Sequence, residues 1–524
     1  MRDALAILDE AEARLAPLSL ATNLAWWESQ VSATEENANR RTRAELAWSD
    51  ALADRELFAA VMAARASGAN GVAGRRLDLL HDLMLAHQVP DDLRARIVEL
   101  ESSVDLRFSR HRGRVGGVEV EDTEIKRILR HSDDPAERRE AWEASKTVGA
   151  EVADDIRELA RLRNEAARAL GHRDWFALSL SADELDERKL IGTLAEADRV
   201  TSAPFTRWKG AVDEKLAARF GCAMSELRPW HYADPFFQET PPEGAVDLDP
   251  LFEDQDVVAL SRRTFDGLGF DVDEILAGSD LYPRDGKNQH AFCIDVDRLG
   301  DVRILANTVQ THDSAETTLH ELGHAVYDLG FGDDLSWLLR STHLVATEAS
   351  ALLCGSLARR REWLELVLGV DSAEVAELGA RLDAARAAEL LVFTRWVLVM
   401  NAFERALYAD PEGDLDAIWW ELVSRYQGVT PPDGRTAPDW AAKIHIATAP
   451  VYYHTYLYGA IVGLQLTAAL EAAAGGIVDR PDAGALLREK LFAPGQSVRW
   501  DRLVEQASGS PLSVASLERA VTKA

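Results

Sequence analysis

Apolar side chains recur at intervals of three and four residues along most of this chain, and Ala, Leu, Glu and Arg are its commonest helix-forming residues. This spacing places the apolar side chains on one face of an α-helix, and these residue types have high helix propensity. The clearest examples are residues 155–170, 373–390 and 437–446. The sequence therefore predicts a mostly α-helical protein.

One segment departs from the helical pattern. Residues 290–296 and 301–307 are rich in β-forming residues, and the turn 297–300 separates them. Two such runs joined by a short Gly-containing turn are typical of a β-hairpin. The hairpin offers a strand edge along which an extended peptide can pair.

The helix predicted after this hairpin has signals at both ends. Asp313 is a candidate N-cap, and Glu316 three residues later completes a capping box. Gly330 and Gly332 are stop signals beyond the last apolar position. Residues 320–324 therefore lie in the middle of a helix.

These five residues, His320-Glu321-Leu322-Gly323-His324, carry the clearest chemistry in the chain. Two histidines four apart project from one helix face, so both imidazoles can bind one zinc ion. Glu321 lies beside the first histidine, where its carboxylate can take a proton from a water that the metal activates. The alternative is a chance match in an Ala-rich helix, and the helix signals and a third ligand argue against it.

A catalytic zinc site needs three protein ligands, and Glu348 is the strongest candidate for the third. It follows His324 by 24 residues, enough for a turn and a second helix packed antiparallel to the first. Apolar neighbours argue for its burial, and a buried carboxylate needs a partner such as a metal, whereas a solvated glutamate does not. Weaker candidates are Asp333, Asp334 and His343.

Residues 443–458 form a second group, dense in polar aromatic side chains. Amide hydrolysis builds negative charge on the carbonyl oxygen, and tyrosine hydroxyls and a histidine are suitable donors to it. Lys443 suits the terminal carboxylate of a peptide. An aromatic helix face packed in the core gives the same pattern, but the zinc motif favours the catalytic interpretation.

Together these motifs resemble known metallopeptidases. The histidine pair with its later glutamate is the pattern of gluzincin peptidases. The Lys-x-His and Tyr-x-x-Tyr segments of the peptidyl-dipeptidase A (angiotensin-converting enzyme) family are similar to Lys443 with His445 and to Tyr453 with Tyr456, with one extra residue between the pairs.

Other segments extend the resemblance over most of the chain. The pair His290-Ala291 resembles a substrate-binding strand of the same family, and residues 26–37 and 162–171 are also similar to it. Residues 281–287 and 450–454 look closer to bacterial oligopeptidases of the oligopeptidase F and thimet type. The resemblance implies one peptidase unit, a mostly α-helical, two-lobed body with a deep central channel and interleaved lobes near 1–270 and 271–524.

The resemblance also implies a role for each matching residue. One zinc ion per chain is held by His320, His324 and Glu348, and Glu321 is the base and proton shuttle. The tetrahedral intermediate is stabilised by Tyr456 and His445. The implied substrate contacts are His290, Ala291, Lys443, Tyr453 and His454.

The chain departs from the angiotensin-converting enzyme family at two positions. An arginine that helps to bind chloride in that family falls at Thr455, which argues against chloride activation. An aspartate that orients a zinc histidine there falls at Leu352, so the partner of that histidine is unassigned. The extra residue before Tyr453 also leaves Tyr452 and Tyr458 as alternative donors.

Composition narrows the classes of partner. A formal net charge of −30 disfavours nucleic acid and anionic membranes. We find no signal peptide and no stretch predicted to span a bilayer, and therefore expect a cytoplasmic protein. Three widely spaced cysteines fit a reducing compartment without disulfides. The loop-like residues 68–74 and 234–249 do not read as domain linkers.

The predicted function is zinc-dependent hydrolysis of peptide bonds in short oligopeptides, by a peptidyl-dipeptidase or an oligopeptidase. A dedicated amidase that tailors one small peptide-like metabolite would use the same site. A non-catalytic peptide-binding protein is the third possibility, although it has no need of Glu321. The sequence does not distinguish a monomer from a dimer.

Overall fold

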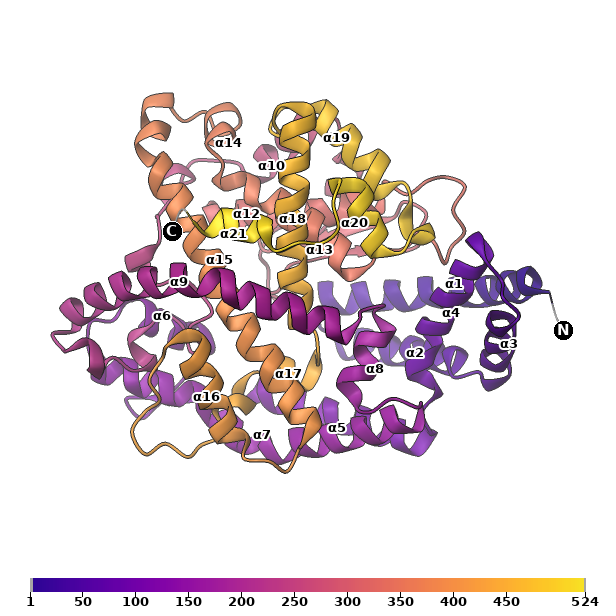
Figure 1. Cartoon of the computed structure of the whole chain (residues 1–524), viewed down its shortest axis with the longest axis horizontal. Helices are drawn as coiled ribbons and strands as arrows, with labels where there is room; N and C mark the ends of the chain where they lie inside the picture. The colour runs from indigo at the N-terminus through magenta and orange to yellow at the C-terminus, as the bar shows by residue number, and fades with distance from the viewer. Residues whose placement is uncertain (1–2, 523–524) are drawn as a thin grey trace. The chain divides into compact units, whose positions relative to one another are not determined.

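The computed structural model describes residues 3–522, and the chain is mostly helical (Figure 1). Within these residues the β structure consists of two antiparallel two-stranded sheets, which pair β1 (Gly113–Val115) with β2 (Val118–Val120) and β3 (Phe292–Asp295) with β4 (Val302–Leu305). The predicted mostly α-helical fold with a small hairpin is confirmed. The first of the two sheets was not predicted.

The contacts divide the chain into two compact units. Unit 1 comprises Met1–Gln88, Asp247–Ala380 and Tyr458–Ser513, and unit 2 comprises Val89–Val246, Arg381–Leu457 and Val514–Ala524. The lobes expected at 1–270 and 271–524, and the channel, stay predictions.

Unit 1 holds the predicted metal-binding helix. Its helices are α1 (Ala4–Val31), α2 (Glu35–Leu52), α3 (Arg55–Ala66), α4 (Gly71–Leu85), α10 (Val257–Gly267), α11 (Asp273–Gly278), α12 (His312–Asp328), α13 (Leu344–Gly355), α14 (Arg361–Leu366), α19 (Pro481–Leu487) and α20 (Trp500–Ser508). The first four helices bury a hydrophobic cluster that includes Leu8, Leu52, Val61 and Leu80. The strands β3 and β4 pack against α12.

Unit 2 is organised around α7. Its helices are α5 (Asp91–Arg110), α6 (Asp122–His131), α7 (Pro135–Ala169), α8 (Trp175–Ala182), α9 (Glu187–Phe220), α16 (Leu415–Gln427), α17 (His445–Thr448) and α21 (Ala515–Val521). Asp134 caps α7 by accepting from the Ala136 amide at 2.8 Å, and Pro135 suits the first helical turn. The helices α5, α6 and α8 all pack on α7.

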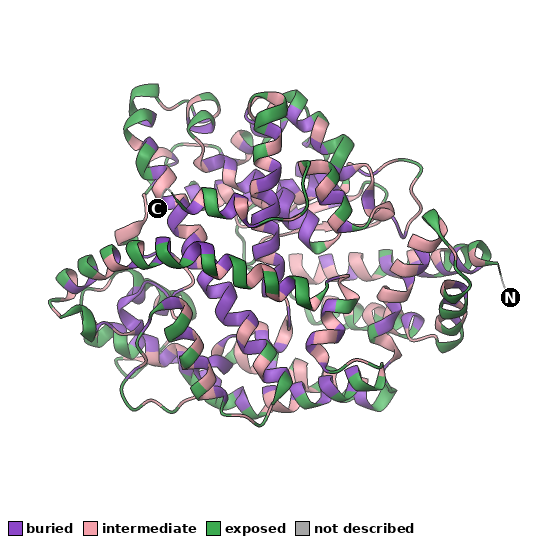
Figure 2. Cartoon of the chain, viewed as in Figure 1, coloured by how far each residue is buried: buried purple, intermediate pink, exposed green. Residues whose placement is uncertain are grey.

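Two helices, α15 (Ser372–Ala409) and α18 (Tyr453–Ala474), have residues in both units. By length and hydropathy α18 is apolar enough to cross a membrane, so the expectation that the chain has no such stretch is wrong. Half of that apolar window is buried inside the protein (Figure 2). Packing in the core explains the apolar composition of α18, because this helix closely approaches α13 at Gly459 and Gly463.

Two of the three helices singled out in the sequence are confirmed. Residues 155–170 lie in α7, apart from the last residue, and residues 373–390 lie in α15. The third prediction, residues 437–446, is wrong. That segment contains the 3₁₀ turn η7 (Asp439–Ala442), an extended Lys443 and only the start of α17. Pro438 lacks an amide donor, and the buried contacts of Lys443 favour an extended backbone there.

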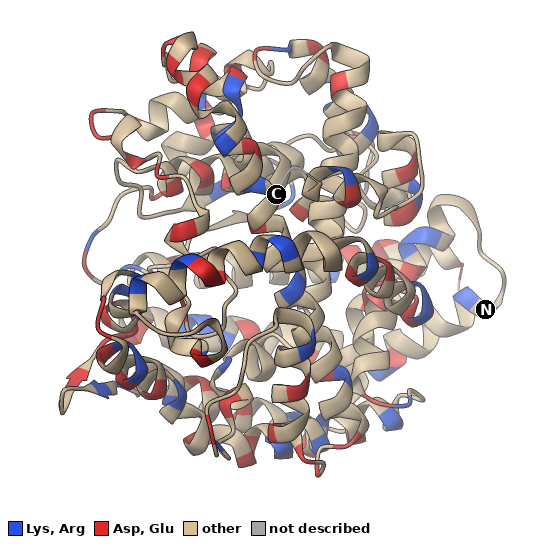
Figure 3. Cartoon of the chain, turned by 60° about the vertical axis from the view of Figure 1, so that its left-hand side comes forward, with Lys and Arg blue, Asp and Glu red and all other residues tan. Residues whose placement is uncertain are grey.

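The charged residues and the cysteines are distributed as the composition suggests. Acidic residues outnumber basic ones by 88 to 58, and Figure 3 shows both kinds interspersed along the helices in that view. The three cysteines, Cys222, Cys293 and Cys354, are free thiols, as expected for a chain without disulfides.

Candidate active site

The first two predicted metal ligands lie on α12, which begins two residues earlier than its sequence suggested. Thr311, rather than Asp313, is the N-cap, and its hydroxyl accepts from the Ser314 amide at 3.2 Å. Thus the predicted capping box is wrong, although the helix itself is confirmed. Leu319 and Leu322 are fully buried, which leaves the two histidines on the more exposed side of the helix.

A close approach between α12 and α13 brings the third ligand to the histidines. A Cβ atom on Gly323 would lie 2.8 Å from the Ala351 Cα, so only glycine permits this spacing. The Ser350 hydroxyl donates to the Gly323 carbonyl at 3.0 Å. The glycine inside the histidine motif therefore sets how near Glu348 comes.

The three predicted ligands do come together. Their ligand atoms, on His320, His324 and Glu348, all lie within 4.8 Å of one another. The two Nε2 atoms are 3.2 Å apart, and His320 Nε2 is 3.9 Å from Glu348 Oε2. Zinc bonds of about 2 Å in tetrahedral geometry place ligand atoms roughly 3.3 Å apart, so the group fits one ion.

Burial sets the protonation of these groups. It lowers the pKa of His320 to about 4, and burial together with the nearby His320 lowers the pKa of His324 to about 3. Both imidazoles are therefore neutral at neutral pH, which is the form that binds a metal.

Glu321, the predicted base, is buried and is tied to the hairpin. Burial, and then the negative charge of Glu348, raise the pKa of Glu321 to about 8, whereas the backbone amide of Cys293 in β3 donates to it and opposes the shift. A divalent cation at the histidines would favour the ionised carboxylate. The base thus lies between the ligand group and the edge of β3, which pairs only with β4 within residues 3–522.

Thr347 is a site residue that the sequence analysis missed. Its hydroxyl lies 2.6 Å from Nδ1 of His324. When Nε2 of this histidine binds a metal, Nδ1 carries the proton and donates it to the Thr347 oxygen, which fixes the ring. The sequence signal that could have identified Thr347 is its hydroxyl, directly before the proposed ligand Glu348. The Thr347 hydroxyl thus gives His324 a hydrogen-bond partner, which the apolar side chain of Leu352 cannot provide.

The other residues considered near the metal site have different surroundings. Asp333 and Asp334 are exposed, and His343 caps α13 by accepting from the Val345 amide. His290 is exposed and Ala291 is partly exposed, and both precede β3 in the chain. Their predicted contacts with substrate stay predictions.

The second predicted group lies in unit 2 and also comes together. The ring centroids of His445 and Tyr453 are 5.2 Å apart, and those of Tyr453 and Tyr456 are 5.7 Å apart. The Lys443 ammonium lies 5.7 Å from the Tyr453 ring centroid. Both tyrosines belong to the first turn of α18.

Lys443 has a partner that the sequence analysis missed. Its Nζ donates to Oε1 of Gln238 at 2.9 Å, and burial lowers the pKa of the ammonium to about 8, opposed by the charge of Asp234. An amide and an ammonium placed together suit a carboxylate. Nothing in the local sequence links positions 238 and 443.

The remaining aromatic positions differ in exposure. Tyr452 is partly exposed and its ring centroid is 5.0 Å from that of Tyr456, whereas Tyr458 is buried and packs near Trp500. His454 is fully buried, so its side chain presents no surface to a ligand here, and its predicted substrate contact stays a prediction.

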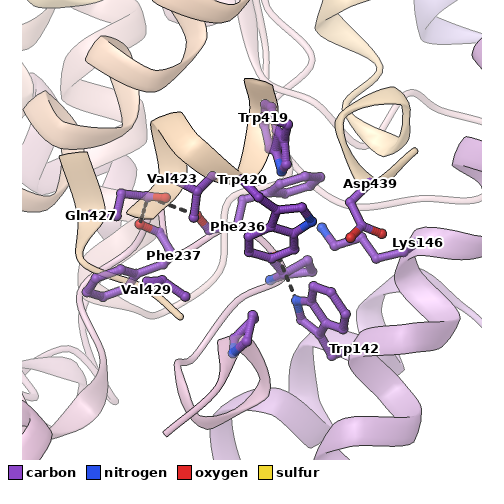
Figure 4. Close-up of a pocket in the computed structure, with 12 residues that line it drawn as sticks. Trp142, Lys146, Phe236, Phe237, Trp419, Trp420, Val423, Gln427, Val429 and Asp439 are labelled. Atoms are coloured by element: carbon purple, nitrogen blue, oxygen red, sulfur yellow. Dashed lines mark hydrogen bonds between the residues drawn. The ribbon is translucent and has the colours of Figure 1, made fainter. Parts of the chain in front are cut away.

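An aromatic pocket in unit 2 contains a second buried lysine (Figure 4). The Lys146 ammonium lies 3.1 Å from the centroid of the Phe236 ring and has no hydrogen-bond partner within residues 3–522. Burial lowers its pKa well below the usual value, and the charge of Asp439 opposes that shift. The Lys443 ammonium lies 5.3 Å from the centroid of the same Phe236 ring, so both buried lysine side chains approach this ring.

Comparison with known proteins gives two family matches on different parts of the chain. Residues 278–523 match peptidase family M3, and residues 1–196 match the angiotensin-converting enzyme family, M2. The first range contains both groups of predicted site residues. The second range contains the N-terminal segments that resemble the angiotensin-converting enzyme family.

Individual relatives agree with the second match. Angiotensin-converting enzyme-like protein Ace3 of Mus musculus is 23% identical over 74% of this chain and 57% of that protein. Angiotensin-converting enzyme of Mesocricetus auratus is 24% identical over 93% of this chain and 40% of that protein, and the Sus scrofa enzyme is 29% identical over 44% of this chain and 18% of that protein. The matched part of the chain therefore covers 57% or less of the length of each of these relatives. The two family matches, together with the three side chains that could hold a metal ion, support a gluzincin metallopeptidase similar to peptidase family M3 and to the angiotensin-converting enzyme family.

Proposed function

We propose that this protein hydrolyses peptide bonds in short oligopeptides with one zinc ion per chain. The observation that carries the proposal is the ligand group on α12 and α13, whose three atoms lie within 4.8 Å of one another beside a buried glutamate. Neutral imidazoles and a carboxylate are ligands that suit zinc. We also propose a cytoplasmic location, on the basis of the three free cysteines.

Each side chain has a stated part in the proposed reaction. Zinc, when bound to His320, His324 and Glu348, supplies a Lewis acid and lowers the pKa of water. Glu321 accepts a proton from the attacking water and later donates it to the leaving amine. Thr347 holds the His324 ring in the tautomer that leaves Nε2 free for the metal.

The group in unit 2 supplies donors and a binding site for substrate. The Tyr456 hydroxyl and the His445 ring donate to the carbonyl oxygen as it becomes anionic, which stabilises the transition state more than the bound substrate. The Lys443 ammonium and the Gln238 amide bind a free C-terminal carboxylate. This pair favours release of short C-terminal fragments.

The test is hydrolysis of a mixed library of short peptides by the zinc-loaded protein, with product masses as the readout. We expect cleavage at bonds near free C-termini, zinc content close to one ion per chain, and no cleavage by the Glu321→Gln variant. Cleavage of one peptide-like metabolite alone would favour the amidase. Unchanged peptides with zinc bound would overturn the hydrolytic proposal and favour a peptide-binding protein.

A further inference from the structure

Residues 446–451 run from inside α17 to the loop just before α18, and they lie between the two proposed donors, His445 and Tyr456. The backbone of Val451 has φ of 59°, in the left-handed region. A β-branched residue is rarely found there, because its Cβ crowds the backbone. Val451 is also buried, so water does not solvate its backbone. This conformation needs support from the surrounding structure.

Glu404 on α15 supplies that support. Its Oε1 accepts the Val451 N–H at 2.7 Å, and only 1% of the residue is exposed. Burial raises the pKa of this carboxyl to about 8, and the Val451 amide and then Arg163 oppose the shift. A carboxyl group is costly to bury, and here it satisfies the amide of the one left-handed residue in the segment.

Arg163 on α7 holds the other end of the segment. Its guanidinium donates to the carbonyls of Ile446, at 3.4 Å, and Ala447. It also donates to the Tyr408 hydroxyl and pairs with Glu101, each at 3.3 Å. Arg163 is 2% exposed, so these bonds form in a largely water-free interior.

The two holding points belong to one network within unit 2. Tyr408 lies one helical turn after Glu404 on α15, and the amide of Asn164, next to Arg163, donates to the Tyr408 carbonyl at 2.8 Å. The network therefore joins α5, α7 and α15 to both ends of residues 446–451. Residues 162–171, singled out in the sequence, thus contribute Arg163 and Asn164 to this network.

We infer that Glu404 and Arg163 are positioning residues, which fix residues 446–451 so that His445 and Tyr456 are held in place for the proposed hydrolysis. They touch the backbone of this segment, and neither is assigned a contact with substrate. Misplacing a reacting group by about 1 Å costs roughly a hundredfold in rate, so a buried clamp on this segment has a direct effect on turnover. The expected effect on kcat rests on the proposed function, whereas the support of the backbone at residues 446–451 does not.

The test compares Glu404→Leu with Glu404→Gln, which keeps an amide oxygen to accept from Val451. For Glu404→Leu we expect kcat to fall by about tenfold to a hundredfold with KM and zinc content unchanged. Glu404→Gln should stay within about threefold of the wild type. Adding Val451→Gly to Glu404→Leu should restore part of kcat, because glycine adopts this φ without strain.

The matched control is Asn401→Ala, which removes another buried polar side chain from α15. Asn401 bonds only to the Val397 carbonyl of its own helix among the hydrogen bonds of the described chain. We expect it to lower the melting temperature but leave kcat near that of the wild type. Equal losses of kcat in Asn401→Ala and Glu404→Leu would overturn the positioning role.

Amide hydrogen exchange separates this inference from the proposed function, because it needs no substrate. Protection around Val451 should fall in Glu404→Leu and be kept in Glu404→Gln and Asn401→Ala. Unchanged protection in Glu404→Leu would overturn the clamp even if the enzyme is active. If Glu404→Leu does not fold, Glu404→Asp carries the same test, because its shorter side chain keeps a carboxyl group but draws it away from Val451.

Discussion

The proposed metal group (His320, His324 and Glu348) and the segment with the proposed donors (residues 443–456, the donor segment) are built in opposite ways. All three proposed metal ligands come from α12 and α13, and the close approach at Gly323 fixes the register of these helices. The donor segment is largely irregular before α18, and its side chains depend on partners far away in sequence, such as Gln238 and Glu404. A motif on regular helices is positioned by its own backbone, whereas an irregular segment is positioned by the rest of its unit.

The difference predicts where each region is fragile. In the metal group, loss of a reacting side chain should remove function and leave the geometry of its neighbours intact, because the helices persist. In the donor segment, loss of a supporting contact should move several reacting side chains at once. Substitutions in the two regions therefore test the comparison.

The largest effect is expected from Glu321→Gln. This change keeps the size of the side chain but removes the proposed base, so we expect kcat to fall on the order of a thousandfold or more. Zinc content should stay close to one ion per chain, measured by elemental analysis. The matched control is Glu316→Gln, five residues earlier on α12, whose carboxylate pairs with Arg359 at 2.7 Å. Near-normal turnover by Glu321→Gln would exclude this residue as the base.

The second-largest effect tests which tyrosine of the donor segment, Tyr456 or Tyr452, is the donor. Tyr456→Phe should lower kcat by roughly a hundredfold to a thousandfold with little change in KM, because its hydroxyl is proposed to act on an oxygen that becomes anionic only in the transition state. Tyr452→Phe, on the neighbouring ring, is the control and should lose less than about tenfold. The reverse order in steady-state kinetics would assign the role to Tyr452.

A smaller effect is expected from Thr347→Val, which removes the hydroxyl beside His324 and keeps the shape of the side chain. The loss of this contact should weaken zinc binding by about tenfold to a hundredfold, measured by competition with a chelator. Thr318→Val is a control on α12, because that hydroxyl bonds only within its own helix and to Thr308 among the described residues. Unchanged zinc affinity in Thr347→Val would show that the contact does not orient the histidine.

The same contrast explains what the sequence could predict. The residues of the metal group were predictable because helical spacing alone brings His320 and His324 together, and an apolar setting marks Glu348 for burial. The N-cap of that helix was misplaced by two positions, since Thr311 and Asp313 are both good caps and the local sequence does not choose between them.

The supports of the donor segment were not predictable in this way. The bond from Lys443 to Gln238 and that from Val451 to Glu404 join residues 205 and 47 positions apart, and neither leaves a periodic signal. The helix predicted for residues 437–446 was wrong for a related reason. Tertiary bonds to Lys443 override the helical propensity of this short segment.

The smallest effect concerns Lys443 and depends on pH. We expect Lys443→Met to raise KM roughly tenfold for peptides with a free C-terminus and to leave C-terminally amidated peptides unchanged. The pKa of Lys443 is lowered by burial to about 8, so the wild-type ammonium is charged below that pH and loses its charge above it. KM for free peptides should therefore rise as pH increases through 8, while KM for amidated peptides stays flat. The exposed Lys490 provides a control substitution, Lys490→Met. Equal kinetics on free and amidated forms of one peptide would mean that Lys443 and Gln238 bind no carboxylate, and the segment would then serve an endo-acting oligopeptidase.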